Sequence, residues 1–255
     1  MSAIQGIAIY VLWLRDIKRL FRAKSRLMGT LLMPLFFLAF LGTGFKRAQL
    51  PGMWGMNYSG FLTPGILGMS ILFSSSFTGL SVIWDREFGF LKEIMVAPVS
   101  RISIVLGRIA GGLTTSLFQA LAIFAVSLVI GFRPRQWLMI FPAIALMILI
   151  SITFIGIGLS FAAKMRDTQG FNLIMNFVIF PLFFLSGALF PLAGFPGWVR
   201  ILSRLDPLTY GVDGLRAALL GQSELPLLLN LGILGACALL SVLIGAWLFE
   251  RSEYL

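Results

Sequence analysis

Six long apolar stretches divide the chain, and none of them contains Asp, Glu, Lys or Arg. A hydrocarbon core about 30 Å thick needs about 20 helical residues to be crossed. Continuous apolar runs favour helices, because barrel strands give only weak ten-residue alternation. The sequence therefore predicts an all-α membrane protein, built as one domain over residues 1–255. The six predicted transmembrane helices are 27–45, 61–84, 109–132, 137–163, 171–195 and 225–249.

Composition excludes several classes of protein. Hydrophobic residues make up 58% of the chain and charged residues 12%, against about 25% charged in soluble domains. The net charge of +10 would suggest nucleic acid in a soluble protein, but here the basic residues lie at the ends of apolar runs, so no nucleic-acid partner is expected. With no His and one Cys, Cys237, neither a thiol–His nucleophile nor an internal disulfide can form. No phosphate-binding Gly-x-x-x-x-Gly-Lys-Ser/Thr loop occurs, so no ATP site and no bound cofactor are expected.

The Lys and Arg residues also predict an orientation. Of the 20, 13 fall on the side that receives both termini and the second and fourth connectors. Positive charge accumulates on the cytoplasmic side of membrane proteins. Both termini of this multi-pass protein are therefore expected in the cytoplasm. The charge-free spans argue against a proton- or sodium-coupled carrier, which needs a carboxylate within the membrane.

Residues 1–26 precede the first apolar stretch and carry an amphipathic pattern. Tyr10, Leu14, Ile17 and Phe21 fall on the face of a helix opposite a basic stripe. This pattern predicts a helix lying at the cytoplasmic membrane interface, with its basic face toward lipid headgroups or a partner. A topology anchor without further function is the alternative. The basic stripe includes Arg15, Lys18, Arg19 and Arg22.

The connector between the second and third stretches, 85–101, mixes both charge signs with aromatic residues. Its first part, 85–97, can form a short helix that stops before Pro98. Short amphipathic helices with exposed aromatic residues suit docking into a groove on another protein. A solvated surface loop and a contact within an oligomer are the alternatives.

On the outer side, the segment 196–216 is too polar to span the membrane but apolar enough to dip into it. Pro207 divides it, so two short helices are expected in a re-entrant arrangement. Asp213 and Arg216, three residues apart, can pair. An interfacial anchor is the alternative. In the fifth stretch, Asn172, Asn176 and Ser186 form a polar stripe that serves equally well for hydrogen bonds between helices or for a substrate path.

Three ordered motifs carry a resemblance to a known family. They are Arg-Glu-Phe-Gly-Phe-Leu-Lys-Glu at 86–93 followed by Val-Ala-Pro-Val-Ser-Arg at 96–101, Phe-Leu-Ser-Gly-Ala-Leu-Phe-Pro-Leu at 184–192, and Asp-Pro-Leu-Thr-Tyr-Gly-Val-Asp-Gly-Leu-Arg at 206–216. With the six spans and the length, they resemble the type-2 (ABC-2) permeases of ATP-binding cassette exporters, nearest to the drug-resistance and nodulation-type permeases. The family often has Asn where this chain has Asp206.

The resemblance implies partners and roles. Two separate ATPase subunits, which bind ATP and Mg, would pair with two permease copies, a homodimer in preference to a heterodimer, in a prokaryotic inner or plasma membrane. The connector 85–101 would be the coupling helix seated on the ATPase. Its coupling residues would be Arg86, Glu87, Phe88, Gly89, Leu91, Lys92, Glu93, Pro98 and Arg101. The outer segment would supply gate or fold-supporting residues, namely Asp206, Pro207, Tyr210, Asp213 and Arg216. The path-lining candidates are Asn172, Asn176, Phe184 and Ser186.

The expected function is that of a non-enzymatic transport subunit. It would export a hydrophobic or amphiphilic substrate, such as a drug, a lipid or a lipid-linked glycan, using the ATPase of its partner. Two other readings stay open at this point. One is a channel or lipid scramblase that needs no ATP, and the other is a membrane anchor for an ATPase complex.

Overall fold

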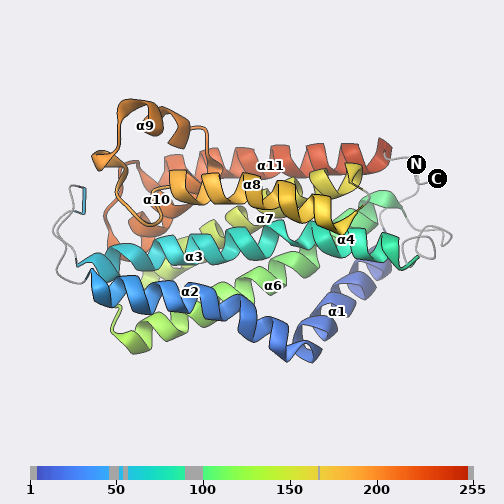
Figure 1. Ribbon diagram of the computed structural model, residues 1–255, viewed down its shortest axis with the longest axis horizontal. Coiled ribbons are helices and arrows are strands. Elements are labelled where there is room, and N and C mark those ends of the chain that lie inside the picture. The colour runs from blue at the N-terminus through green and yellow to red at the C-terminus, as the bar shows by residue number, and fades with distance from the viewer. Residues whose placement is uncertain (1–4, 46–51, 54–56, 90–99, 166, 252–255) are drawn as a thin grey trace.

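In the computed structural model, residues 5–45, 52–53, 57–89, 100–165 and 167–251 are described, and their regular structure is helical throughout (Figure 1). Long helices run side by side along the molecule, and two short ones, α9 and α10, lie at one end. The helices are α1 (Gly6–Arg22), α2 (Lys24–Gly44), α3 (Tyr58–Ser76), α4 (Thr78–Glu87), α6 (Arg101–Ile130), α7 (Ile140–Lys164), α8 (Thr168–Leu185), α9 (Gly197–Ser203), α10 (Pro207–Leu220) and α11 (Leu227–Arg251), with short 3-10 turns at Trp137–Met139 and Leu192–Gly194.

Five helical segments of the described chain are long and apolar enough to cross a membrane. They are Tyr58–Glu87 (α3 and α4), Ile102–Ile130, Trp137–Lys164, Thr168–Leu185 and Leu227–Phe249. Each contains most of a predicted stretch. The first predicted stretch corresponds to the shorter apolar helix Met28–Gly44 within α2.

The predicted end of the fifth stretch at residue 195 is wrong. α8 ends at Leu185, and Gly187 takes a left-handed conformation with φ of +72°. A side chain at this φ is disfavoured, so Gly is the residue that lets the chain leave the helix here. Hydropathy alone missed this turn, because residues 188–190 are as apolar as the helix before them.

The helix α3 lies at the centre of the bundle and packs against α2, α6, α7, α8 and α10. In the span formed by α3 and α4, 72% of the most apolar 18-residue segment is buried, compared with 22–44% of the corresponding segment in each of the other four spans. Small residues let its neighbours approach. A Cβ on Gly65 of α3 would lie 2.0 Å from the carbonyl oxygen of Ala188, and one on Gly79, in the α4 part of the same span, would lie 2.3 Å from that of Gly158.

The N-terminal helix α1 packs against α6, which the two-sided amphipathic pattern does not predict. Leu12 is buried at the contact, close to Gly107 of α6, and the Trp13 indole N–H donates to the Thr114 hydroxyl at 3.0 Å. Tyr10 and Phe21 remain exposed. One face of α1 therefore packs against the bundle, in addition to its apolar face and its basic face.

The start of α1, the ends of α4 and α11 and the α7–α8 turn lie at the same end of the bundle (Figure 1). We call this the α1 end. α9 lies at the other end, where α2 finishes and α3 begins.

Candidate functional site

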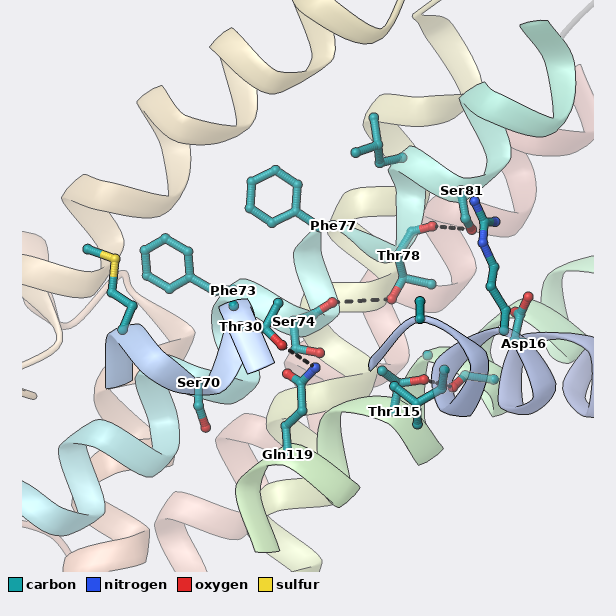
Figure 2. Close-up of a pocket in the computed structure, with 18 of the residues that line it drawn as sticks. Asp16, Thr30, Ser70, Phe73, Ser74, Phe77, Thr78, Ser81, Thr115 and Gln119 are labelled. Atoms are coloured by element: carbon teal, nitrogen blue, oxygen red, sulfur yellow. Dashed lines mark hydrogen bonds between the residues drawn. The ribbon is translucent and has the colours of Figure 1, made fainter. Parts of the chain in front are cut away.

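A cavity of about 490 Å³ lies inside the α1 end of the bundle, between α1, α2, α3, α4, α6 and α8 (Figure 2). This volume is within the range of small-molecule sites, roughly 300–1,000 Å³. Neutral polar side chains from five of these helices line it. They are Thr30, Ser70, Ser74, Thr78, Ser81, Thr115, Gln119 and Asn172.

Several of the cavity hydroxyls donate to backbone carbonyls three or four residues earlier in the chain. Ser70 donates to the Leu67 carbonyl at 2.8 Å and Thr115 to the Gly111 carbonyl at 2.9 Å. Thr78 donates to the Ser74 carbonyl at 3.4 Å. A hydroxyl has one proton and two lone pairs. Each of these oxygens therefore faces the cavity mainly as a hydrogen-bond acceptor.

Aromatic rings form another part of the wall. Phe73 and Phe77 come from α3 and its end, Trp84 from α4 and Phe180 from α8. The rings of Phe73 and Phe180 meet edge to face with centroids 5.5 Å apart. The cavity thus combines aromatic faces with hydrogen-bonding groups, and it can hold a ligand that is partly apolar.

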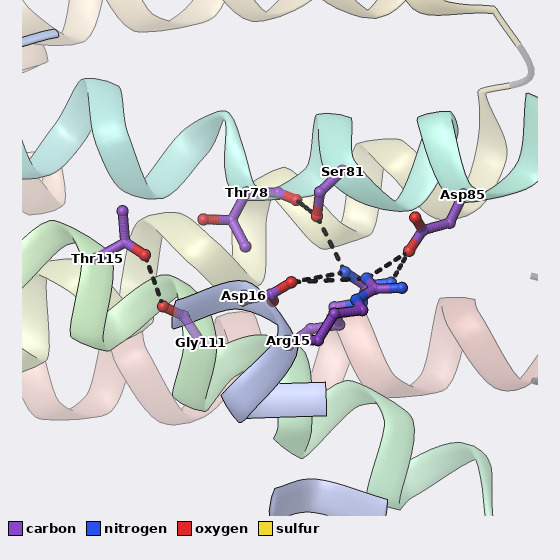
Figure 3. Close-up of polar contacts among 8 residues, drawn as sticks. Arg15, Asp16, Thr78, Ser81, Asp85, Gly111 and Thr115 are labelled. Atoms are coloured by element: carbon purple, nitrogen blue, oxygen red, sulfur yellow. Dashed lines mark hydrogen bonds and ion pairs between the residues drawn. The ribbon is translucent and has the colours of Figure 1, made fainter. Parts of the chain in front are cut away.

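Four charged side chains form an ion-pair cluster where α1, α4 and α6 meet (Figure 3). Arg108 pairs with Asp85 and lies 3.4 Å from Asp16. Arg15 lies 2.7 Å from Asp85 and 3.5 Å from Asp16. The Arg108 side chain is 1% exposed, and it also donates to the Ser81 hydroxyl at 3.4 Å. The cluster joins three helices that the sequence separates widely.

Small residues on α6 position this cluster. A Cβ on Gly111 would lie 2.5 Å from a carboxylate oxygen of Asp16. Because Gly107 and Gly111 are one turn apart, α1 lies close enough for Asp16 to reach Arg108. Asp16, Asp85 and Arg108 were not among the site residues predicted from the sequence. The signal for Asp85 and Arg108 was a charge of each sign directly beside the ends of neighbouring apolar stretches, and Asp16 gave no such signal.

The basic stripe of α1 divides in the structure. Arg15 turns inward to the cluster, whereas Lys18, Arg19 and Arg22 are exposed. The Arg19 guanidinium lies 5.1 Å from the centre of the Trp84 ring. Together with Arg15, Ala23 and Asp85, these three cations line an open groove, which we call the α1 groove.

The predicted coupling residues take different positions. The predicted helix does not begin separately at Asp85, because residues 85–87 complete α4, and Gly89 then turns the chain with φ of +76°. The Phe88 side chain is 82% exposed. Leu91, Lys92, Glu93 and Pro98 lie outside the described residues, as does the side chain of Arg101.

Arg86 and Glu87 bind the α7–α8 turn. Arg86 donates to the Met165 carbonyl at 2.6 Å and to the Ala162 carbonyl at 3.3 Å. A carboxylate oxygen of Glu87 accepts from the Thr168 N–H at 3.1 Å and from its hydroxyl at 2.7 Å, at the start of α8. These two side chains thus hold the end of α4 to its neighbours within the chain.

The predicted outer residues form hydrogen bonds that close the other end. Arg216 donates to the Gly187 carbonyl at 2.7 Å and lies over the Phe61 ring, 3.7 Å from its centre. Asp213 accepts from the Glu224 N–H at 2.8 Å and from the Asn230 amide at 2.8 Å. The predicted pairing of Asp213 with Arg216 is not among the ion pairs of the described residues.

Tyr210 and Pro207 shape the start of α10. The Tyr210 hydroxyl donates to the Arg204 carbonyl at 2.7 Å, and Pro207 is the first residue of the helix. Pro is favoured at this position, where the backbone N–H has no partner in the helix. These contacts support a structural role for the outer segment.

Asp206 caps the N-terminus of α10, accepting from the Leu208 N–H at 2.9 Å. Burial raises the pKa of its carboxyl to about 7, against an ordinary value of about 3.9, although the hydrogen bonds from Leu208 and Thr209 oppose this. A neutral side chain is therefore favoured here.

We expect Asp206 to make folding stability fall as the pH rises. The folded pKa exceeds the unfolded one, so its contribution is full below about pH 4 and is lost as the pH rises to about 7. Asp206→Asn keeps the capping oxygen but cannot ionise. Its stability relative to the parent should rise by up to about 3 kcal/mol between pH 5 and 8, at about 1.4 kcal/mol per unit. Unfolding in detergent at each pH measures this, and parallel pH profiles for the two proteins would contradict it.

The path-lining candidates separate. Asn172 lines the cavity, and Ser186 is buried, with its hydroxyl donating to the Phe183 carbonyl at 2.8 Å. Asn176 and Phe184 lie on the exposed face of α8. The polar stripe thus lies partly at the cavity, through Asn172, and partly on the exposed face of α8, through Asn176.

Comparisons with known proteins agree on one group. The model of a family described as ABC-2 type transporter matches residues 7–220, which include the cavity, the ion-pair cluster and the outer segment. The inner membrane transport permease YadH of Escherichia coli K12 is 27% identical over 238 residues, covering 92% of this chain and 91% of the relative. The transport permease ycf38 of Pyropia yezoensis is 32% identical over 221 residues (84% and 74%). Nodulation protein J of Rhizobium meliloti is 26% identical over 231 residues (90% and 87%).

Proposed function

The chain belongs to the ABC-2 type transporter family, and we propose that it is the permease subunit of an ATP-driven exporter. The observation that carries this proposal is the family match, which spans both the cavity and the connector after α4. The chain itself would not hydrolyse ATP. Permeases of this family work with separate ABC ATPases, and ATP and Mg would be bound there.

We propose six spans, with α2 as the first of them. Its apolar part, Met28–Gly44, packs beside α3 and exposes Leu32, Phe36 and Phe40. In a bilayer these side chains would face lipid or a second permease. An even number of spans agrees with a start of α1 and an end of α11 at the same end of the bundle (Figure 1). The charge bias supports a cytoplasmic position for this end, with α1 at the membrane interface.

A second copy of the chain would complete the transport path. The exposed face of α8 carries large apolar side chains, including Phe177, which is 85% exposed, and Phe184 at 56%. Homodimeric packing along such a face would leave the cavities of both copies beside a shared path. Aromatic faces and hydrogen-bonding groups in the cavity suit a hydrophobic or amphiphilic substrate better than an ion.

The connector after α4 would receive the motion of the ATPases. It joins α4, which carries Asp85, to α6, which carries Arg108. Because these residues pair with each other and with α1, a displacement of the connector would move all three walls at the α1 end of the cavity. ATP binding would shift the equilibrium between conformations only through its different affinity for each of them.

We expect Phe88→Ala to weaken ATPase docking without unfolding the permease. The ring is 82% exposed, so its removal leaves no internal cavity. Aromatic anchors often contribute 2 kcal/mol or more to an interface, so the ATPase recovered with the permease should fall by about tenfold or more. Co-purification measures this, with Phe141→Ala, an exposed ring at the start of α7, as the control. Equal recovery with both variants would contradict a docking role for Phe88.

The central experiment is co-purification through a tag on the permease, followed by ATP hydrolysis in lipid nanodiscs. We expect a complex of two permeases and two ATPases that hydrolyses ATP. A folded permease without an associated ATPase would favour a channel or scramblase. A complex that hydrolyses ATP but moves no substrate would favour a membrane anchor.

A further inference from the structure

The cavity and the α1 groove are adjacent and share part of their walls. Arg19 and Ala23 line both of them, at the junction of α1 and α2. From there the cavity extends past Ser81 toward Phe73 and Gln119 (Figure 2). A single elongated molecule can therefore occupy the groove with one part and the cavity with another.

The groove has an excess of positive charge. The ion-pair cluster is balanced, because Arg15 and Arg108 are matched by Asp16 and Asp85. Lys18, Arg19 and Arg22 take part in no ion pair among the residues that the structure describes. These three cations lie within one and a half turns of α1 and face the same groove. Arginine and lysine in this arrangement favour a phosphate or another anionic group.

The same charges disfavour a cationic ligand. The carboxylates nearest the cavity, Asp16 and Asp85, are each held by two arginines. A cation entering through the groove would pass the three unmatched positive charges first. The charges around the groove therefore favour an anionic ligand over a cationic one, although the aromatic rings by themselves could also accept a cation.

The cavity wall selects a second property of the ligand. Ser70, Thr78 and Thr115 each use their proton on a backbone carbonyl three or four residues earlier in the chain. Their oxygens accept hydrogen bonds, so a ligand that brings hydroxyl or amide donors is preferred over one that brings only acceptors.

We infer that the α1 groove and the cavity form one binding site for an anionic amphiphile, with the anionic group in the groove and a donor-bearing part in the cavity. The inference rests on the proposed transport function, because it names the class of substrate that would enter from the cytoplasmic leaflet. A general attraction of a basic helix to anionic lipid would explain the groove but not a dependence on the cavity hydroxyls.

Three lipids with matched chains test both parts of the site. Phosphatidylglycerol is anionic and carries hydroxyl donors, phosphatidylmethanol is anionic without them, and phosphatidylcholine is zwitterionic. Native mass spectrometry of the delipidated full chain in detergent measures the affinity for each. We expect phosphatidylglycerol to bind at least tenfold more tightly than phosphatidylcholine and several-fold more tightly than phosphatidylmethanol.

Two double variants assign these preferences to the two parts. Lys18→Gln with Arg22→Gln, both exposed, should remove most of the preference over phosphatidylcholine. Arg200→Gln with Arg204→Gln, two exposed cations in and beside α9, is the matched control. Thr78→Val with Thr115→Val should remove the preference over phosphatidylmethanol. Thr43→Val is its control, because Thr43 makes the same kind of helix bond on an exposed surface.

Three results would overturn the inference. One is equal binding of all three lipids. Another is a lipid preference that the cavity variant leaves intact. The third is competition by free glycerol 1-phosphate as effective as that by phosphatidylglycerol, which would indicate a site for a soluble phosphate ester. Binding needs no ATPase, so a failure of the exporter proposal and a failure of this inference are separately visible.

Discussion

Replacing Asp85 by asparagine is expected to lower the free energy of unfolding by about 3 kcal/mol. Asp85 is the shared partner of Arg108 and Arg15, and the Arg108 side chain is 1% exposed. Removal of the carboxylate charge leaves a buried guanidinium that water cannot solvate. The cost is placed at the low end of the usual range because Asp16 stays 3.4 Å from Arg108. Unfolding of the purified permease in detergent measures it.

A double variant distinguishes the contribution of the Asp85–Arg108 ion pair from the contribution of each residue alone. Arg108→Met together with Asp85→Asn removes one charge of each sign and leaves Arg15 beside Asp16 at 3.5 Å. We expect this double variant to be at least as stable as Asp85→Asn alone, because no unmatched buried charge remains. Arg22→Gln, an exposed change on α1, should cost less than about 0.5 kcal/mol. If the losses in the free energy of unfolding caused by Asp85→Asn and by Arg108→Met simply add up in the double variant, the pairing is contradicted.

Gly79→Ala is expected to reduce the stability of the bundle by about 1–3 kcal/mol or to prevent folding. The new methyl group would lie 2.3 Å from the carbonyl oxygen of Gly158 and 3.1 Å from the Phe171 ring. The first neighbour is backbone, so α4 and α7 would have to separate. Because α4 carries Asp85, this separation would also disturb the ion-pair cluster. The yield of monodisperse protein and the unfolding midpoint in detergent both report it.

Gly232→Ala provides the matched control. Gly232 lies in α11, and a Cβ built there meets nothing within 4 Å. Ala is the better helix former by up to about 1 kcal/mol, so this variant should be as stable as the parent or slightly more so. If both alanine variants behave alike, helix propensity rather than close packing of α4 on α7 determines the result.

Much of the architecture was predictable from local sequence. Hydropathy indicated helices over α3–α4, α6, α7 and α11, because a charge-free run of this length requires a helix whose backbone groups are paired internally. Pro207 indicated that the outer segment divides into two short helices, and the second of them begins at Pro207 in the structure, with Asp206 as its cap. The end of α8 was not predictable in this way, because the turn at Gly187 depends on backbone conformation and not on polarity.

The candidate site was predictable only in part. Arg15, Arg19 and Asn172 were singled out, but Arg15 was expected to face lipid or a partner and instead turns toward Asp85. Arg86 and Glu87 were expected to dock an ATPase. In the structure both side chains contact the α7–α8 turn of the same chain, and the docking role stays a prediction. A helical pattern gives the face on which a charge lies, but it does not give the partner that this face meets.

The sequence by itself determined that the long apolar helices lie in a membrane and not in water, because hydropathy is a local property. It also determined the family of the chain, because the ordered motifs are local as well. The tertiary structure decided which charges meet and where a cavity remains. Arg15 and Asp85 are 70 positions apart, and Asp16 and Arg108 are 92 apart. Their contact depends on how α1 and α6 are rotated and on the close approach that Gly107 and Gly111 allow. Such rotations follow from packing over the whole bundle, which no single stretch of sequence specifies.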